Sequence, residues 1–277
     1  MNAQRKPDSG FRRAIKRIPF LYSLLSALKN VVFTVKGFFG YHYGQRRRIA
    51  LVYSSMRTGS TLFKSLIGEA DDVSLIDEFN FLPYLGRNRY LFYGLVSSLA
   101  REPVILLKKP YNNNPGHLKK YGCSPLAEAK KIILYRDPYD TLCSLRNLQI
   151  RRDRRRFDDV ELVEYWCDCY ENLLRNTLDE EVLVVRYEDI TEHPVELTAE
   201  IFPFIGSSRK EGVESYGAYE WVGGRDDISD QIKSLKVAKA KVNSREENPG
   251  LFDMVKQSKR VERILQHLDS ARFQVPG

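Results

Sequence analysis

The chain has 277 residues, enough to bury a substantial core in one large domain, or in one domain with an appendage. Its 43% hydrophobic and 29% charged residues exclude a disordered chain. The net charge of +8 favours a polyanionic partner, and nucleic acid, anionic membrane, acidic glycan and multiply phosphorylated nucleotide all satisfy it.

Residues 1–48 form a basic amphipathic segment that precedes an expected domain at 49–277. Apolar residues recur there at three- and four-residue steps and draw one stripe on a helix: Ile15, Ile18, Leu21, Leu25, Leu28, Val32, Val35 and Phe39. Pro19 should start or kink this helix, and Lys29 and Lys36 interrupt its apolar run. Three interpretations stay open: a helix packed on the protein's own core, a signal anchor, or a peripheral membrane contact through residues 11–40. We expect a cytoplasmic protein, with the membrane surface as the alternative location.

From residue 49 onward, short apolar runs alternate with helical patterns. The expected strands are Ile49–Ser54, Val73–Ile76, Val104–Leu107, Lys131–Tyr135 and Val182–Arg186. The expected helices are Thr61–Glu69, Asp140–Gln149, Glu161–Thr177 and Pro194–Phe204. Continuous apolar strands that alternate with helices predict an α/β domain of three layers, in which a central parallel sheet is flanked by helices. Ligands of such sheets bind at the carboxyl ends of the strands.

The first strand runs into a loop, Ser54–Thr61, that is suited to an anion. Gly59 permits a close backbone approach, Ser60 and Thr61 add hydroxyl donors, and Arg57 adds a positive charge at the start of a helix. The loop is not a nucleotide triphosphatase P-loop, because no lysine follows Gly59. Taken alone, it could equally be an ordinary helix cap.

A second loop of the same kind follows the fourth strand, in KIILYRDPYDTLCS. Arg136 stands at the end of the strand, Pro138 suits a first helical turn, and Ser144 lies about two helical turns further on. An arginine fork with a nearby hydroxyl is a good phosphate clamp. Two anion-binding loops at one sheet edge suit a ligand with phosphates at both ends.

Together these motifs resemble those of the sulfotransferases that use 3′-phosphoadenosine 5′-phosphosulfate (PAPS), in the style of the carbohydrate and tyrosylprotein branches. The 5′-phosphosulfate loop of the family is similar to Arg57-Thr58-Gly59-Ser60-Thr61, and its 3′-phosphate segment to Arg136-Asp137-Pro138 with Ser144. A third similarity is the strand and turn at Arg186–Asp189. The resemblance covers about residues 49 to 206 and implies a P-loop-like fold, PAPS as co-substrate and no metal. Only Val222–Arg225 loosely matches the late glycine-rich segment of the aryl and steroid branch.

The resemblance also implies a catalytic set. Glu78, after the second strand, matches the general base, with Asp77 as its neighbouring rival and His117 as an alternative base. Lys108, two residues before Pro110, matches the lysine that assists the leaving group, although Lys109 competes with it. Arg57 would share that role.

The acceptor is expected to carry a hydroxyl, on a carbohydrate first, then on a peptide tyrosine or a lipid head group. The connections 80–103 and 207–250 should shape its pocket, and the basic run Arg151–Arg156 is either a solvated face or a groove for an anionic acceptor. Aromatic residues are not interleaved with that run, which argues against nucleic acid. Two rival functions stay open: a kinase or triphosphatase on a similar sheet, and a non-catalytic membrane- or glycan-binding protein with a degenerate PAPS site.

The four cysteines, Cys123, Cys143, Cys167 and Cys169, form no CxxC pair. Their spacing favours reduced thiols in a core over disulfides or a structural zinc site.

Overall fold

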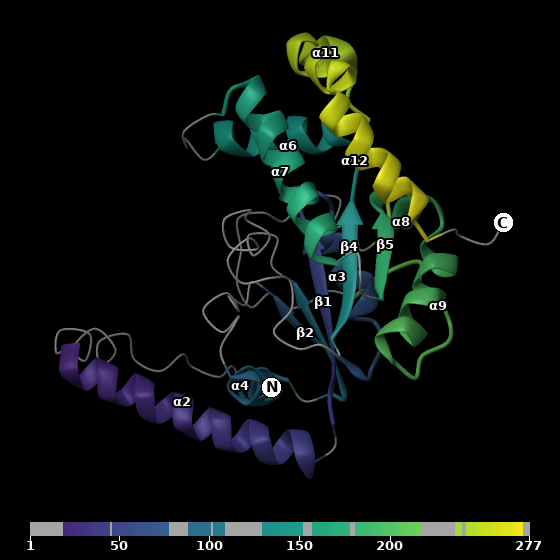
Figure 1. Ribbon diagram of the computed structural model, residues 1–277. Coiled ribbons are helices and arrows are strands. Elements are labelled where there is room, and N and C mark those ends of the chain that lie inside the picture. The colour runs from purple at the N-terminus through teal and green to yellow at the C-terminus, as the bar shows by residue number, and fades with distance from the viewer. Residues whose placement is uncertain are drawn as a thin grey trace.

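The computed structural model describes residues 19–44, 46–77, 88–100, 102–108, 129–151, 157–177, 181–217, 236–239 and 242–273. Within them one parallel sheet has five strands, in the order β2-β3-β1-β4-β5 (Figure 1). The strands are β1 Arg48–Ser54, β2 Val73–Asp77, β3 Val104–Lys108, β4 Lys130–Tyr135 and β5 Val182–Arg186. The order places β1 at the centre, with the ends of β3 and β4 on either side of it.

Helices cover both faces of this sheet (Figure 1). The helices are α2 Pro19–His42, α3 Ser60–Ile67, α4 Arg89–Leu99, α6 Pro138–Arg151, α7 Asp159–Thr177, α8 Tyr187–Glu192, α9 Pro194–Ile205, α11 Pro249–Gln257 and α12 Lys259–Ser270, with a 3-10 turn η4 at Arg245–Glu247. One apolar cluster contains Leu51 and Ile133 from the sheet and Phe92, Trp166 and Leu251 from α4, α7 and α11. The other lies on the opposite face, where α3, α8 and α9 pack. The predicted three-layer α/β fold is confirmed.

The five predicted strands are confirmed, four of them with bounds that differ by a residue at one end. The three inner strands β1, β3 and β4 are almost entirely buried, because both faces of the sheet are covered, whereas the outer strands β2 and β5 are largely half-buried. The predicted helices differ more: Thr61–Glu69 is Ser60–Ile67, and Asp140–Gln149 is Pro138–Arg151. The connection 80–103 contains α4, and the connection 207–250 ends in η4 and the start of α11, none of which was predicted.

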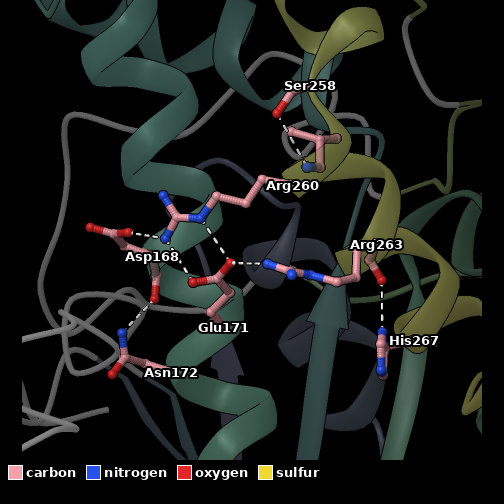
Figure 2. Close-up of polar contacts among 8 residues, drawn as sticks. Asp168, Glu171, Asn172, Ser258, Arg260, Arg263 and His267 are labelled. Atoms are coloured by element: carbon pink, nitrogen blue, oxygen red, sulfur yellow. Dashed lines mark hydrogen bonds and ion pairs between the residues drawn. The ribbon is translucent and has the colours of Figure 1, made fainter.

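Four charged side chains join α12 to α7 (Figure 2). Arg260 of α12 binds both Asp168 and Glu171 of α7, and Arg263 donates to Oε1 of Glu171 at 3.2 Å. The hydrogen bond from Arg260 holds the pKa of Glu171 below its usual range. Ser258 caps α12 by accepting a hydrogen bond from the backbone N–H of Val261. This network fixes the C-terminal helix beside the sheet.

Helix α2 lies along one end of the molecule, away from the arrowheads of the strands (Figure 1). It crosses α4 so closely that a Cβ on Gly37 would lie 1.8 Å from the carbonyl oxygen of Tyr90, and one on Gly94 would lie 2.0 Å from that of Phe33. Glycine at both positions therefore permits this crossing. Among the described helices, none combines the length and the hydropathy that crossing a bilayer demands.

Candidate active site

The loop that joins β1 to α3 bends sharply. Arg57 has φ +70° and Gly59 has φ +89°, and Arg57 is the only non-glycine residue of the described chain with positive φ. Left-handed residues in such a turn orient successive backbone N–H groups toward one point, at the positive end of the α3 dipole. Strain of this kind at a non-glycine residue concentrates at ligand sites. Both features are typical of an anion-binding turn.

Two tyrosines of α7 support this loop from behind. The hydroxyl of Tyr165 accepts a hydrogen bond from Met56 N at 3.1 Å, and the hydroxyl of Tyr170 lies 3.4 Å from Ser55 N while donating to the carbonyl of Leu134 at 2.9 Å. Burial raises the pKa of both phenols, so both stay protonated at neutral pH. Thr58 closes the loop with its hydroxyl 2.7 Å from that of Ser55.

The second loop is fixed at the end of β4. Asp137 caps α6 by accepting a hydrogen bond from Asp140 N at 3.0 Å, and its own N–H donates to Glu188 at 3.1 Å. Burial raises the pKa of Asp137. Asp140 accepts two hydrogen bonds of 2.7 Å from Asn243, from the backbone N–H and from the side-chain amide. The C-terminal part of the chain thus closes on the first turn of α6.

The structure brings the two loops together. Nε of Arg57 donates to Oγ of Ser144 at 3.1 Å, although the two residues are 87 positions apart. The guanidinium of Arg136 lies 4.8 Å from the centroid of the Tyr187 ring, and the same ring covers Gly59. Arg136 is buried, with 8% of its surface exposed, so its charge faces a largely desolvated environment. The predicted residues Arg57, Gly59, Arg136 and Ser144 therefore belong to one site.

The remaining loop residues continue this site into the helix. Thr58 and Ser60 are buried, whereas Thr61 is half-buried at the first turn of α3. The backbone N–H groups of this turn lack an intrahelical acceptor by helix geometry.

The predicted catalytic residues are only partly described. Lys108 ends β3 and is buried, with 6% exposure, and its register partners are Val52 of β1 and Asp77 of β2. This places Lys108 beside the central strand, at the sheet edge from which the Ser54–Thr61 loop departs. Glu78, Lys109 and His117 lie outside the described residues, and so do Val222–Arg225 and most of the run Arg151–Arg156.

Two functional positions were not singled out by sequence reasoning. Tyr187 and Glu188 lie in the recognised segment Arg186–Asp189. Only the structure shows that Tyr187 contacts both loops and that Glu188 accepts a hydrogen bond from Asp137 N in the second loop. The sequence did offer one sign that these two residues belong to the site, because they directly follow the carboxyl end of β5. Burial raises the pKa of Tyr187, so its ring packs against both loops as a neutral phenol.

Residues 108–211 match the family model described as "Sulfotransferase family". This segment of the chain is similar to the sulfotransferase family. Sulfotransferases take the sulfo group from PAPS. The match includes Lys108, Arg136, Ser144 and Tyr187, while the loop Ser54–Thr61 precedes it. No curated protein matches the chain.

One solved structure with a TM-score above 0.5 supports the fold of this chain, and two others are similar at lower scores. The sulfotransferase domain from the curacin biosynthetic pathway superimposes with a TM-score of 0.58 at 18% identity, over 83% of this chain and 99% of that one. The sulfotransferase domain of the Synechococcus PCC 7002 olefin synthase gives 0.49 at 16% identity, over 83% and 97% of the two chains. A sulfotransferase from Alicyclobacillus acidocaldarius gives 0.48 at 15%, with the same coverage. Among the described residues, no three His, Cys, Asp or Glu side chains gather as metal ligands.

Proposed function

We propose that this chain is a sulfotransferase that binds PAPS across the two loops and transfers its sulfo group to an acceptor hydroxyl. The observation that carries the proposal is the hydrogen bond from Arg57 to Ser144, which joins the loop after β1 to the helix after β4. A donor with a phosphosulfate at its 5′ end and a phosphate at its 3′ position needs two cationic sites at one edge of the sheet. Arg57 and Arg136 supply them.

The residues fit the donor by charge and by shape. The turn at Thr58–Thr61 would hold the 5′-phosphosulfate, because its backbone N–H groups and hydroxyls stand at a helix N-terminus. Arg136 and Ser144 would hold the 3′-phosphate, where a guanidinium can form paired hydrogen bonds. A side chain at Gly59 would collide with Tyr187, so glycine lets the loop lie directly against that ring.

Sulfo transfer needs a base for the acceptor hydroxyl and positive charge on the leaving oxygen. Lys108 and Arg57 would neutralise the leaving oxygen, and Glu78 would take the proton. Lys108 suits its task because it is buried beside β1, where its charge acts with little screening. The proposed acceptor is a carbohydrate hydroxyl, on an anionic glycan in particular, followed by a peptide tyrosine or a lipid head group.

Calorimetry with 3′,5′-adenosine bisphosphate and with ATP–magnesium tests the proposal. We expect metal-free binding of the bisphosphate that is lost in Arg136→Ala. A preference for ATP–magnesium would indicate a kinase or triphosphatase and would overturn the proposal. If the bisphosphate binds but a panel of hydroxylated acceptors stays unsulfated, in wild type and in Glu78→Gln alike, the site binds the donor without catalysis.

A further inference from the structure

Helix α2 exposes an apolar face over most of its length. Its exposed apolar side chains fall within an arc of about 140° on a helical projection: Phe20, Leu24, Leu25, Leu28, Val31, Val32, Val35, Phe38 and Phe39. Several of them are more than half exposed, including Leu28 at 60% and Val35 at 51%. We name these nine residues the α2 stripe. An exposed apolar surface of this size marks an interaction site.

The opposite side of α2 is already occupied. Gly37, which the close crossing with α4 requires, lies nearly opposite the centre of the α2 stripe on the helical projection. The hydrogen bond between His42 and the hydroxyl of Tyr90, at 2.8 Å, holds the end of the helix to α4. The helix is therefore fixed to the domain by one face and presents the α2 stripe outward. Packing on the protein's own core does not account for the stripe.

Positive charge is concentrated in the N-terminal part of the sequence, which includes this helix. Residues 1–48 contain eleven Lys and Arg but only one acidic residue, Asp8, whereas residues 49–277 contain 33 basic and 35 acidic residues. The excess positive charge of the protein thus belongs to the N-terminal segment. On α2 itself, the exposed Lys29 and Lys36 lie at one border of the stripe. An apolar face with lysines at its border is the pattern of a helix that lies in the interface of an anionic bilayer.

The basic surface continues beyond α2 to the amino ends of the strands. Arg46, Arg47, Arg48 and Lys130 line a cavity of about 610 Å³ there, and Glu181 is the acidic residue of its lining. Arg47 and Arg48 donate to the backbone carbonyls of Ala100 and Gly206, which are neutral acceptors. Their positive charge therefore adds to the field that an anionic surface would meet at this end of the molecule.

We infer that the α2 stripe docks on the surface of a bilayer that contains anionic lipids. The apolar side chains enter the boundary between head groups and acyl chains, while Lys29, Lys36 and Arg46–Arg48 attract the lipid phosphates. A second copy of this chain would fit the stripe poorly, because it would bring two strongly basic segments together. The inference does not depend on the proposed donor site, which lies at the other end of β1.

Vesicle co-sedimentation of the full chain tests this inference. Wild type should bind phosphatidylcholine vesicles that contain phosphatidylserine, and bind pure phosphatidylcholine much less. Binding should weaken as salt rises, because salt screens the attraction. The double variant Leu28→Glu with Val35→Glu should bind at least about 10-fold less, since it places charge in the apolar face. Lys29→Glu with Lys36→Glu should remove much of the preference for phosphatidylserine.

Matched controls separate docking from misfolding. Val160→Glu and Val242→Glu change valines that are 50% and 78% exposed elsewhere on the molecule, and should leave vesicle binding unchanged. Every variant should retain the wild-type unfolding temperature and affinity for adenosine bisphosphate. Equal vesicle binding by wild type and the Leu28/Val35 variant would overturn the inference. A wild-type dimer in sedimentation that the same variant converts to a monomer would also overturn it, because the stripe would then be a contact between copies.

Discussion

The ring of Tyr187 occupies the space next to Gly59 that any other residue would need. A Cβ built on Gly59 would lie 2.1 Å from two carbons of that ring, and the φ of +89° is itself unfavourable for an L side chain. The two residues come from different motifs, and their contact couples the shape of the loop after β1 to the segment after β5.

Gly59→Ala should therefore abolish donor binding. The methyl group must displace Tyr187 or distort the loop, and a strained backbone of this kind costs about 1–3 kcal/mol. We expect at least a 50-fold (about 2.3 kcal/mol) loss of affinity for adenosine bisphosphate in calorimetry. Gly217→Ala is the matched control, because its Cβ would meet nothing closer than 3.5 Å and its φ is ordinary. Equal binding by both variants would contradict the assigned role of the loop.

Ser144→Ala removes the hydroxyl that accepts the hydrogen bond from Arg57. A hydrogen bond to a charged group contributes about 1.5–3 kcal/mol, so the affinity for adenosine bisphosphate should fall about 10-fold or more. In an Arg57→Ala background the same change should matter less, because the partner is already gone. Ser98→Ala serves as the control, since Ser98 bonds only within α4, to the carbonyl of Gly94. Additive losses in the double variant would show that Arg57 and Ser144 act separately.

Arg136→Lys preserves the charge but removes the planar fork. Affinity for adenosine bisphosphate should fall about 10-fold, because a lysine cannot form the paired hydrogen bonds of a guanidinium. Affinity for 5′-AMP, which lacks the 3′-phosphate, should stay the same. The control is Arg209→Lys, where a guanidinium also lies over an aromatic ring, Phe202 at 5.5 Å, but away from the two loops. Equal losses for both nucleotides would remove Arg136 from the 3′ site.

Glu171→Gln tests the network between α7 and α12 shown in Figure 2. The hydrogen bond from Arg260 lowers the pKa of Glu171, so this carboxylate stabilises the fold above its unfolded pKa of about 4.3 and loses that contribution as the pH falls through its lower folded value. At pH 7 the free energy of unfolding of the variant, measured with denaturant, should be lower than that of wild type by up to about 1 kcal/mol. The difference is no larger because the partners are partly exposed. The difference from wild type should shrink below about pH 4.

Glu164→Gln, an exposed position on the same helix, is the control and should unfold like wild type at every pH. If the loss of unfolding free energy in Glu171→Gln stays constant down to strongly acidic pH, the packing of the side chain, rather than its charge, stabilises the helix pair.

The sheet could be predicted from the sequence because each strand is an unbroken apolar run such as Val104–Leu107, and helices cover both faces of the sheet. Arg57 and Arg136 could be singled out as candidate anion-binding residues, because each follows such a strand. The hydrogen bond between Arg57 and Ser144 could not be predicted. It depends on β1 and β4 being neighbours in the sheet, and only the strand order of the structure shows this. Helix α12 was not among the predicted helices, although its apolar positions Val261, Ile264, Leu265 and Leu268 follow the i, i+3, i+4, i+7 spacing of an amphipathic helix.

The length of β1 also sets the distance between α2 and the proposed donor loop. β1 begins just after α2 and ends at the proposed donor loop, so its seven residues separate the two by about 20 Å. Any surface that binds α2 would therefore keep the sulfo donor at a fixed distance from it, at the carboxyl ends of the strands, which point away from that surface. An acceptor would then approach the donor from the surrounding solution, or as a long chain attached to the same surface that extends past the protein. The length of the acceptor would therefore contribute to substrate selection.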